Sequence, residues 1–168
     1  MHYEEHPSKA TRWRDGKLHV LPAAKQADST VWFSHGPAGP DSRWEGLLAR
    51  RRGEESAVIC AVPFWIYDLS LGDEVAVIPS AEGPLVATGL RHHADAFTFR
   101  VSWTHPHPHQ PWLGLMQELE SHDCWFDVRS ESFLALSAPG QHAQAVADYL
   151  AAQETRGSFQ YETGRTAA

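Results

Sequence analysis

The sequence predicts an α+β protein in which a small β-barrel or rolled antiparallel sheet is followed by a ferredoxin-like βαββαβ unit. Two observations predict this fold class. The first half contains short stretches rich in Val, Ile and Trp, separated by Gly, Pro and Ser, which is typical of a small closed or rolled sheet. From residue 95 onward, alternating and 3.6-residue hydrophobic patterns follow in the order strand, helix, strand, strand, helix, strand.

We therefore expect four segments along the chain. They are an N-terminal extension over residues 1–17, a β-rich, barrel-like half over 18–94, a ferredoxin-like half over 95–162 and a frayed tail over 163–168. The strands expected in the first half are 18–21, 31–33, 44–50, 56–62, 74–78 and 85–89.

The second half begins with a half-buried strand, because every second residue from 97 to 103 is aromatic or Val. Pro111 then opens a helix, a position where its missing N–H costs no hydrogen bond. The remaining expected elements are strands at 124–128 and 133–137, a helical stripe over 143–150 that Gly157 stops, and a strand at 159–161.

Composition excludes several classes of protein. The 168 residues are 42% hydrophobic and 21% charged, which is typical of a globular chain. The net charge of -7 argues against nucleic-acid binding, and the longest apolar run, 57–67, is too short for a membrane span. The start of the chain lacks the pattern of a secretory signal, and Cys60 and Cys124 lie in apolar stretches. We expect a cytoplasmic monomer or homodimer.

The stretch from Pro63 to Val75 reads Pro-Phe-Trp-Ile-Tyr-Asp-Leu-Ser-Leu-Gly-Asp-Glu-Val. It resembles the Pro-Phe, then Leu-Ser-x-Gly-Asp, stretch of an uncharacterised bacterial family of domains of unknown function, in which a small β unit precedes an αβ unit. The resemblance covers residues 31–162 and implies the same two-part organisation, but no activity or site. The residues themselves indicate an architectural role: Gly72 permits a bend, Asp73 binds the turn backbone, and Phe64 fills the barrel.

Histidines alternate with prolines after the first strand of the second half. Proline favours an extended, polyproline-like backbone, in which alternate Cα atoms lie about 6 Å apart. His105, His107 and His109 could therefore share one transition metal such as zinc, and Glu131 could approach as an oxygen ligand. A solvated loop, or a metal acquired during purification, is the alternative interpretation. No cofactor is required by any other pattern.

The ferredoxin-like arrangement would bring a second group of polar residues to one end of its sheet. Imidazole, carboxylate and thiol groups together could bind zinc or act as acid, base and nucleophile. Cys124 is in phase with apolar neighbours, however, which favours a core thiol. The candidate catalytic residues are His93, His122, Cys124 and His142, with His92, Asp95 and Asp123 nearby.

Four residues are candidates for ligand binding. Trp65 and Tyr67 could rim a pocket or a partner surface. Arg100 and Trp125 belong to the open face of the predicted sheet, which we expect to pack on the barrel half or on a second copy. RNA recognition by this face is not favoured, because Trp125 is the single aromatic residue there.

The sequence contains no nucleophile elbow, phosphate-binding glycine loop, paired-Cys zinc pattern or dinucleotide fingerprint. It favours a cytoplasmic accessory or binding module that holds an unknown partner protein or small molecule at the seam of its two halves, without nucleic acid, membrane or assigned catalysis. One alternative is an enzyme or metal-binding protein that uses the His/Cys cluster. A second is a protective or immunity protein that sequesters a toxin or metabolite.

Overall fold

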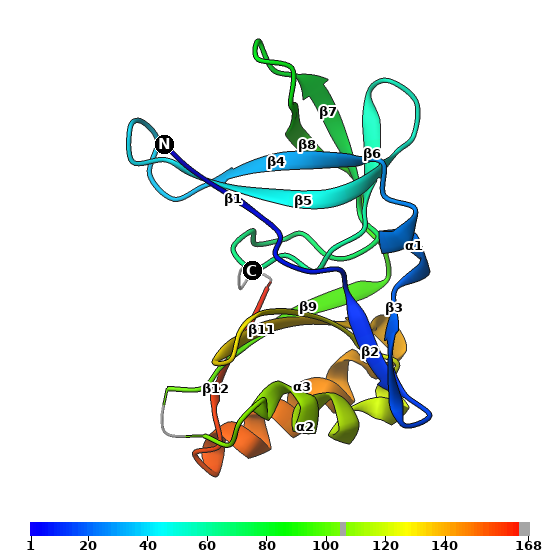
Figure 1. The fold of residues 1–168 in the computed structure, drawn as a ribbon, viewed down its shortest axis with the longest axis vertical. Coiled ribbons are helices and arrows are strands. Elements are labelled where there is room, and N and C mark those ends of the chain that lie inside the picture. Colours follow the sequence, from blue (N-terminus) through cyan, green and yellow to red (C-terminus); the bar gives the residue numbers. More distant parts are fainter. Residues whose placement is uncertain (105–106, 165–168) are drawn as a thin grey trace.

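The computed structural model describes residues 1–104 and 107–164, which form a barrel layer and a layer of sheet and helices (Figure 1). The first sheet contains β1 (His2–Glu5), β4 (Ser29–His35), β5 (Arg43–Arg51), β6 (Ser56–Ile59), β7 (Glu74–Pro79) and β8 (Leu85–His92). The second contains β2 (Thr11–Arg14), β3 (Lys17–Val20), β9 (Ala96–Ser102), β10 (Trp125–Ser130), β11 (Phe133–Pro139) and β12 (Gln160–Thr163). The helices are α1 (Pro22–Lys25), α2 (Pro111–Glu118) and α3 (Gly140–Thr155), with a 3₁₀ turn at Glu120–His122.

Five strands close the barrel in the order β5-β4-β8-β7-β6. Closure depends on β5, which pairs with β4 along most of its length and with β6 at its end, where Ala49 is opposite Ile59. Val31, Leu47 and Val75 fill the interior and are fully or almost fully buried. The small barrel predicted from the sequence is therefore confirmed. β1 pairs in parallel with residues 43–46 of β5, on the edge opposite β4.

The second half of the chain has the element order β9, α2, β10, β11, α3, β12. Its strands pair antiparallel in the order β12-β9-β11-β10, and β2 and β3 extend the sheet beyond β10. Both long helices cover the face of the sheet that points away from the barrel (Figure 1). Val101, Phe126 and Leu134 of the sheet pack there against Leu115 and Val146 of the helices. The α+β class is confirmed.

The expected N-terminal extension is instead part of both sheets. Residues 2–5 pair with β5, whereas residues 11–14 form a hairpin with residues 17–20 and reach β10 through Thr11. The strand expected at 18–21 therefore belongs to the second sheet and not to the barrel. β1 and β2 were not expected from the sequence because each has four residues, too few for a reliable hydrophobic alternation.

The first two residues of the expected frayed tail, 163 and 164, are instead paired with the rest of the structure. Thr163 lies in β12 opposite Phe99, and the Gly164 N–H donates to the Thr98 carbonyl over 2.7 Å. The Gly164 carbonyl in turn accepts from the Asp68 N–H over 2.7 Å. These bonds hold Gly164 between the two layers, and residues 165–168 lie outside the described part of the chain.

The chain from residue 60 to 73 passes between the barrel and the second sheet, and we call this interface the seam. At its end Asp73, fully buried, accepts hydrogen bonds from the Ser70 and Ala94 N–H groups, and Gly72 has φ +90°. This is the architectural role predicted for the turn. Phe64, however, packs in the seam beside His6 and does not fill the barrel, because it lies in the segment that leaves the barrel after β6.

Candidate functional site

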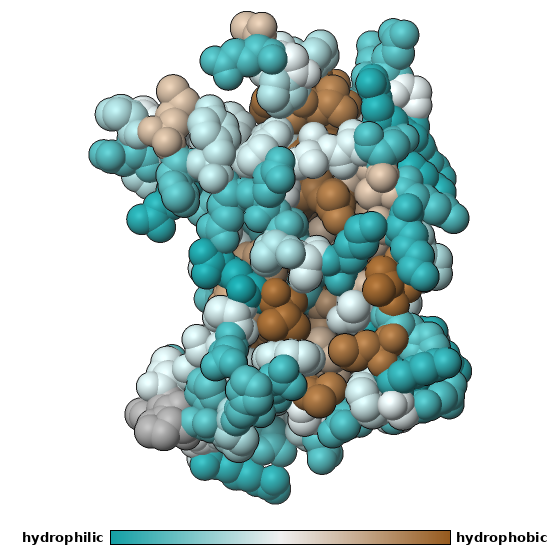
Figure 2. Space-filling view, in the orientation of Figure 1, coloured by the Kyte–Doolittle hydropathy of each residue, from teal (hydrophilic) through white to brown (hydrophobic). Residues whose placement is uncertain are grey.

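The face of the second sheet that carries Arg100 is covered by the barrel. Thr98, Arg100 and Asp127 are at most 2% exposed, although all three are polar. Of the two coverings expected from the sequence, the structure therefore has the barrel half. Figure 2 shows apolar residues gathered near the middle of the molecule, with hydrophilic residues around them.

Two carboxylates and one imidazole form a buried network across the seam. Glu45 of β5 accepts hydrogen bonds from the backbone N–H groups of Phe64 and Trp65 over 2.7 and 3.0 Å. Asp127 of β10 accepts from the Val62 N–H over 2.8 Å. The His6 ring lies between them, with Nδ1 3.5 Å from Asp127 and Nε2 3.9 Å from Glu45. The network thus joins the N-terminal segment, the barrel and the second sheet.

Burial determines the electrostatics of this network. It raises the pKa of the Glu45 carboxyl, and backbone hydrogen bonds to Phe64 and Trp65 oppose the rise. Burial likewise raises the pKa of Asp127, opposed by His6 and by hydrogen bonds. Because the acceptors are already occupied by backbone donors and the side chains are closed to solvent, the network holds the seam chain in place.

Arg100 forms the second polar connection across the seam. Its guanidinium donates to the Ile66 carbonyl over 2.7 Å and to Glu162 over 3.2 Å, and it lies 4.4 Å from the centre of the Tyr67 ring. Tyr67 itself donates to Glu162 over 2.9 Å, and its pKa is raised by partial burial and by that carboxylate. Two of the candidate ligand-binding residues, Arg100 and Tyr67, are thus in contact with each other.

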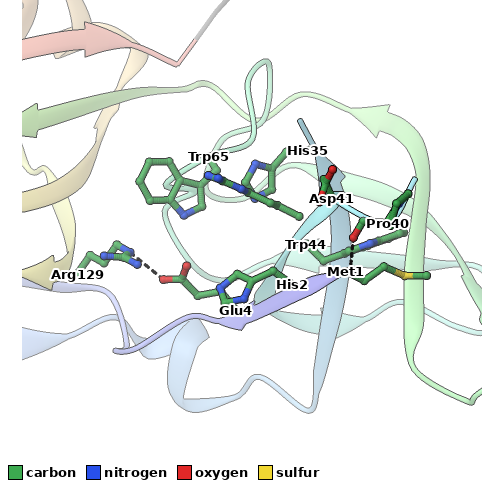
Figure 3. A pocket seen from close by; sticks show the side chains of 10 residues that line it. Met1, His2, Glu4, His35, Pro40, Asp41, Trp44, Trp65 and Arg129 are labelled. Carbon is green, nitrogen blue, oxygen red and sulfur yellow. Dashed lines mark hydrogen bonds and ion pairs between the residues drawn. The ribbon is translucent and has the colours of Figure 1, made fainter. Parts of the chain in front are cut away.

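A cleft of about 780 Å³ opens where the seam meets β1 and the loop before β5 (Figure 3). In Figure 3 Trp65 and His35 lie together at one side of the cleft, and Arg129 donates to Glu4 beneath them over 2.7 Å. The Met1 amino group bonds to the Pro40 carbonyl at the other end. The lining residues are Met1, His2, Glu4, His35, Pro40, Asp41, Arg43, Trp44, Trp65 and Arg129.

Trp65 is held rigidly at the edge of this cleft. Its ring is stacked on Phe133 at 5.2 Å and 6°, and on His35 at 6.3 Å and 15°. Its backbone N–H is bound by Glu45. On the other side of the stack a smaller hollow of about 350 Å³ is lined by Trp65, Phe133 and Arg100 among others. The sequence singled out Trp65 but missed Arg43 and Arg129, which carry no distinctive local pattern.

The predicted His/Cys cluster forms only in part. His122 and His142 lie 5.6 Å apart between ring centres, and the Gly140 N–H donates to the Asp95 carbonyl, so these segments do meet. His93 instead lies 3.6 Å from buried Asp73, and His92 is opposite Glu74 in the barrel. Both histidines lie at the end of the barrel strand β8 or just after it, before the chain enters β9. They are therefore separated from His122 and His142.

Cys124 is a core thiol and not an exposed nucleophile. It is 2% exposed among the residues packed beneath α2, and burial raises its pKa to about 12. A thiol with this pKa remains protonated at neutral pH. Within residues 1–104 and 107–164 no group of three or more His, Cys, Asp or Glu side chains is arranged to hold a metal ion.

The His-Pro segment gives one confirmed contact. His109 Nδ1 lies 3.1 Å from Glu131, so the approach of these two segments that the sequence predicts is present. His107 Nδ1 donates to the Pro108 carbonyl, and His105 lies outside the described residues. A metal at this position stays a prediction.

Trp125, the remaining ligand-binding candidate, is covered by the Arg12 guanidinium, which lies 4.5 Å from the centre of its ring.

The model of the family called Domain of unknown function (DUF4265) matches residues 45–161. The chain belongs to this family. A crystal structure of a hypothetical protein from Neisseria gonorrhoeae is similar, with a TM-score of 0.69 and 16% sequence identity. The similarity covers 83% of this chain and 96% of that chain, and at this identity it shows the fold alone. No curated protein matches this DUF4265 chain.

The DUF4265 match covers part of the site but not the strand β1. The matched region includes Glu45, Trp65, Arg100 and Arg129, whereas β1, which forms one wall of the cleft, precedes it.

None of the helices in the described part of the chain is long and apolar enough to cross a membrane.

Proposed function

We propose that this DUF4265 protein is a non-catalytic binding module that holds a small zwitterionic ligand in the cleft at the seam. The observation that carries the proposal is the chemistry of the cleft wall. Arg129 is neutralised by Glu4, but Arg43 and Asp41 are exposed and form no ion pair with another described residue. Arg43 and Asp41 face a volume of about 780 Å³ together with the Met1 amino group, which is bonded to the Pro40 carbonyl, and this volume is within the range of small-molecule sites.

The remaining wall supports binding of a small molecule with an apolar part. Trp44 and Trp65 supply aromatic surface beside the charged groups. Burial and the nearby Arg43 charge lower the pKa of His35, so its ring is neutral at pH 7 and competes little for an anion. The ligand's carboxylate would pair with Arg43 and its ammonium group with Asp41.

Rigidity of the wall also supports a binding role. Glu45 fixes the Trp65 backbone, and Phe133 and His35 fix its ring, so little side-chain entropy is lost when a ligand arrives. The polar network behind Trp65 is closed to solvent and its acceptors are occupied, which supports a structural and not a catalytic role for it.

Two further proposals made from the sequence, a ferredoxin-like second half and a cytoplasmic location, are each supported by a feature outside the cleft. The strand order β12-β9-β11-β10, with antiparallel pairing and two helices on one face, supports a ferredoxin-like second half. Cys60 and Cys124 are buried free thiols, which supports a cytoplasmic location.

The proposal is tested by titrating the full chain with free amino acids and with their N-acetyl amides, using calorimetry. We expect at least one free amino acid to bind about tenfold more tightly than its N-acetyl amide, because the amide lacks both charges. Replacing Arg43 with Gln is expected to weaken that binding by about tenfold or more.

Arg91→Gln provides the matched control, because Arg91 is an exposed arginine whose partner, Glu55, lies outside the cleft. It should bind the amino acid as the unaltered chain does. The proposal fails if no free amino acid binds at millimolar concentration, or if Arg43→Gln and Arg91→Gln bind equally well.

A further inference from the structure

A second hollow, of about 470 Å³, lies on the outer surface of the barrel. Strand register places Tyr3 of β1 opposite Trp44 of β5, and Trp32 of β4 opposite Gly46 of β5. Side chains alternate along a strand, and Leu47, next to Gly46, points into the barrel core. Tyr3, Trp32 and Trp44 therefore share the outer face, and all three line the hollow.

Gly46 makes the arrangement of these rings possible. A Cβ atom at Gly46 would lie 3.0 Å from two atoms of the Trp32 ring, so the ring lies directly across the glycine. The Trp44 indole N–H donates to Ser42, which leaves its ring to face the hollow. Tyr3 then meets Trp32 at 5.4 Å and 88°, and Trp44 at 6.0 Å and 21°.

The charge of the hollow is negative. Glu82 lines it from the turn between β7 and β8, which is closed by a hydrogen bond from the Ser80 N–H to the Pro84 carbonyl over 2.8 Å. Among the described lining residues none is Lys, Arg or His, and Glu82 is the single carboxylate. An anionic ligand would be repelled here, whereas a cation would find both a countercharge and aromatic surface.

We propose that this hollow binds a small quaternary ammonium compound. The faces of aromatic rings attract cations, and three rings, those of Tyr3, Trp32 and Trp44, line the hollow in which one cationic group would lie. A methylated ammonium group also suits the site because it presents apolar methyl groups to Val86 and Pro84 and needs no hydrogen-bond acceptor. This site is separate from the seam cleft, with which it shares Trp44 alone among the described lining residues.

The test titrates the full chain with choline, and with 3,3-dimethyl-1-butanol, which has the same shape and no charge. We expect choline to bind about tenfold more tightly, which corresponds to about 1.4 kcal/mol. If both compounds bind equally, the hollow recognises apolar shape and the proposal is wrong. If choline does not bind at millimolar concentration, the proposal is also wrong.

Four variants locate the binding. Tyr3→Leu and Glu82→Gln should each weaken choline binding at least about threefold, whereas Glu55→Gln, an exposed carboxylate elsewhere, should not. Tyr3 and Glu82 are exposed, so neither change threatens folding, and melting curves check this. Unchanged binding in both variants would overturn the assignment to this hollow. Arg43→Gln should leave choline binding unaltered, which separates this site from the seam cleft.

Discussion

At the scale of single residues, Glu45 is the acceptor on which the seam chain depends. Its two carboxylate oxygens accept from two successive backbone N–H groups, those of Phe64 and Trp65. In Glu45→Gln an amide NH₂ must face one of these N–H groups, which leaves a buried donor without an acceptor. We expect the free energy of unfolding to fall by about 1–3 kcal/mol, measured by urea titration.

The control for Glu45 is Glu55→Gln, because the Glu55 side chain is 83% exposed. It should change the free energy of unfolding by less than about 0.5 kcal/mol. Equal stability of the Glu45 and Glu55 variants would show that the two buried hydrogen bonds contribute nothing to the seam.

Asp127 should make stability depend on pH. Burial raises its pKa above the ordinary 3.8, so the native state holds this proton more tightly than the unfolded chain does. The resulting stabilisation is present below pH 3.8 and is lost as pH rises through the folded-state pKa. His6 at 3.5 Å is its titratable neighbour, and Glu45 lies beyond the same ring.

Asp127→Asn replaces the titratable carboxyl group with an amide that stays neutral at every pH tested. Its amide oxygen can still accept from the Val62 N–H, and the Ser8 hydroxyl can reverse to accept from the amide. Between about pH 4 and neutral pH we expect the variant to gain stability relative to the unaltered chain, by about 1.4 kcal/mol per unit of pKa shift removed. Urea titrations at several pH values measure this difference, and a constant or declining difference would contradict it.

At the scale of elements, the strands and helices of the second half could be predicted because their hydrophobic patterns are long and unambiguous. β1 and β2 could not, because β1 pairs with a strand about forty residues away, and β2, besides its hairpin with β3, joins the sheet through Phe126, more than a hundred residues away. One signal for the site was available. Glu45 is in phase with Leu47 and Ala49 on the buried face of β5, and a carboxylate at such a position must find partners.

The turn that ends the seam chain gives a prediction at the same scale. Gly72 and Gly53 both have positive φ, at +90° and +76°, so an alanine is strained at either position. Only at Gly72 would the new Cβ meet a neighbour, Ala94 Cβ at 3.1 Å. Gly72→Ala should therefore cost about 1 kcal/mol more in unfolding free energy than Gly53→Ala.

Chemical denaturation of both glycine variants provides the comparison. Equal losses would indicate that backbone strain alone accounts for the glycine in the Leu-Ser-x-Gly-Asp stretch. A larger loss at Gly72 would support the close packing of this turn against the start of β9.

At the scale of the whole molecule, the barrel and the second sheet are tied into one unit. The N-terminal segment contributes a strand to each sheet, and His6 between those strands lies in the seam network. Sequence reasoning placed a seam between two halves but assigned residues 1–17 to neither. It therefore missed the wall of the cleft that β1 supplies, which no local pattern in those residues indicates.

Arg100 tests whether the two layers unfold together. Its buried guanidinium spans from β9 to the Ile66 carbonyl, so Arg100→Met leaves that carbonyl without its donor and Glu162 without its cation. We expect a loss of about 2–4 kcal/mol, against less than about 1 kcal/mol for Glu162→Gln, whose side chain is half exposed. Because the layers share the seam, far-ultraviolet circular dichroism and tryptophan fluorescence should still report one coincident transition at a lower denaturant concentration. Two separate transitions, or a loss of amide protection confined to one layer, would show instead that the layers are independent domains that merely touch.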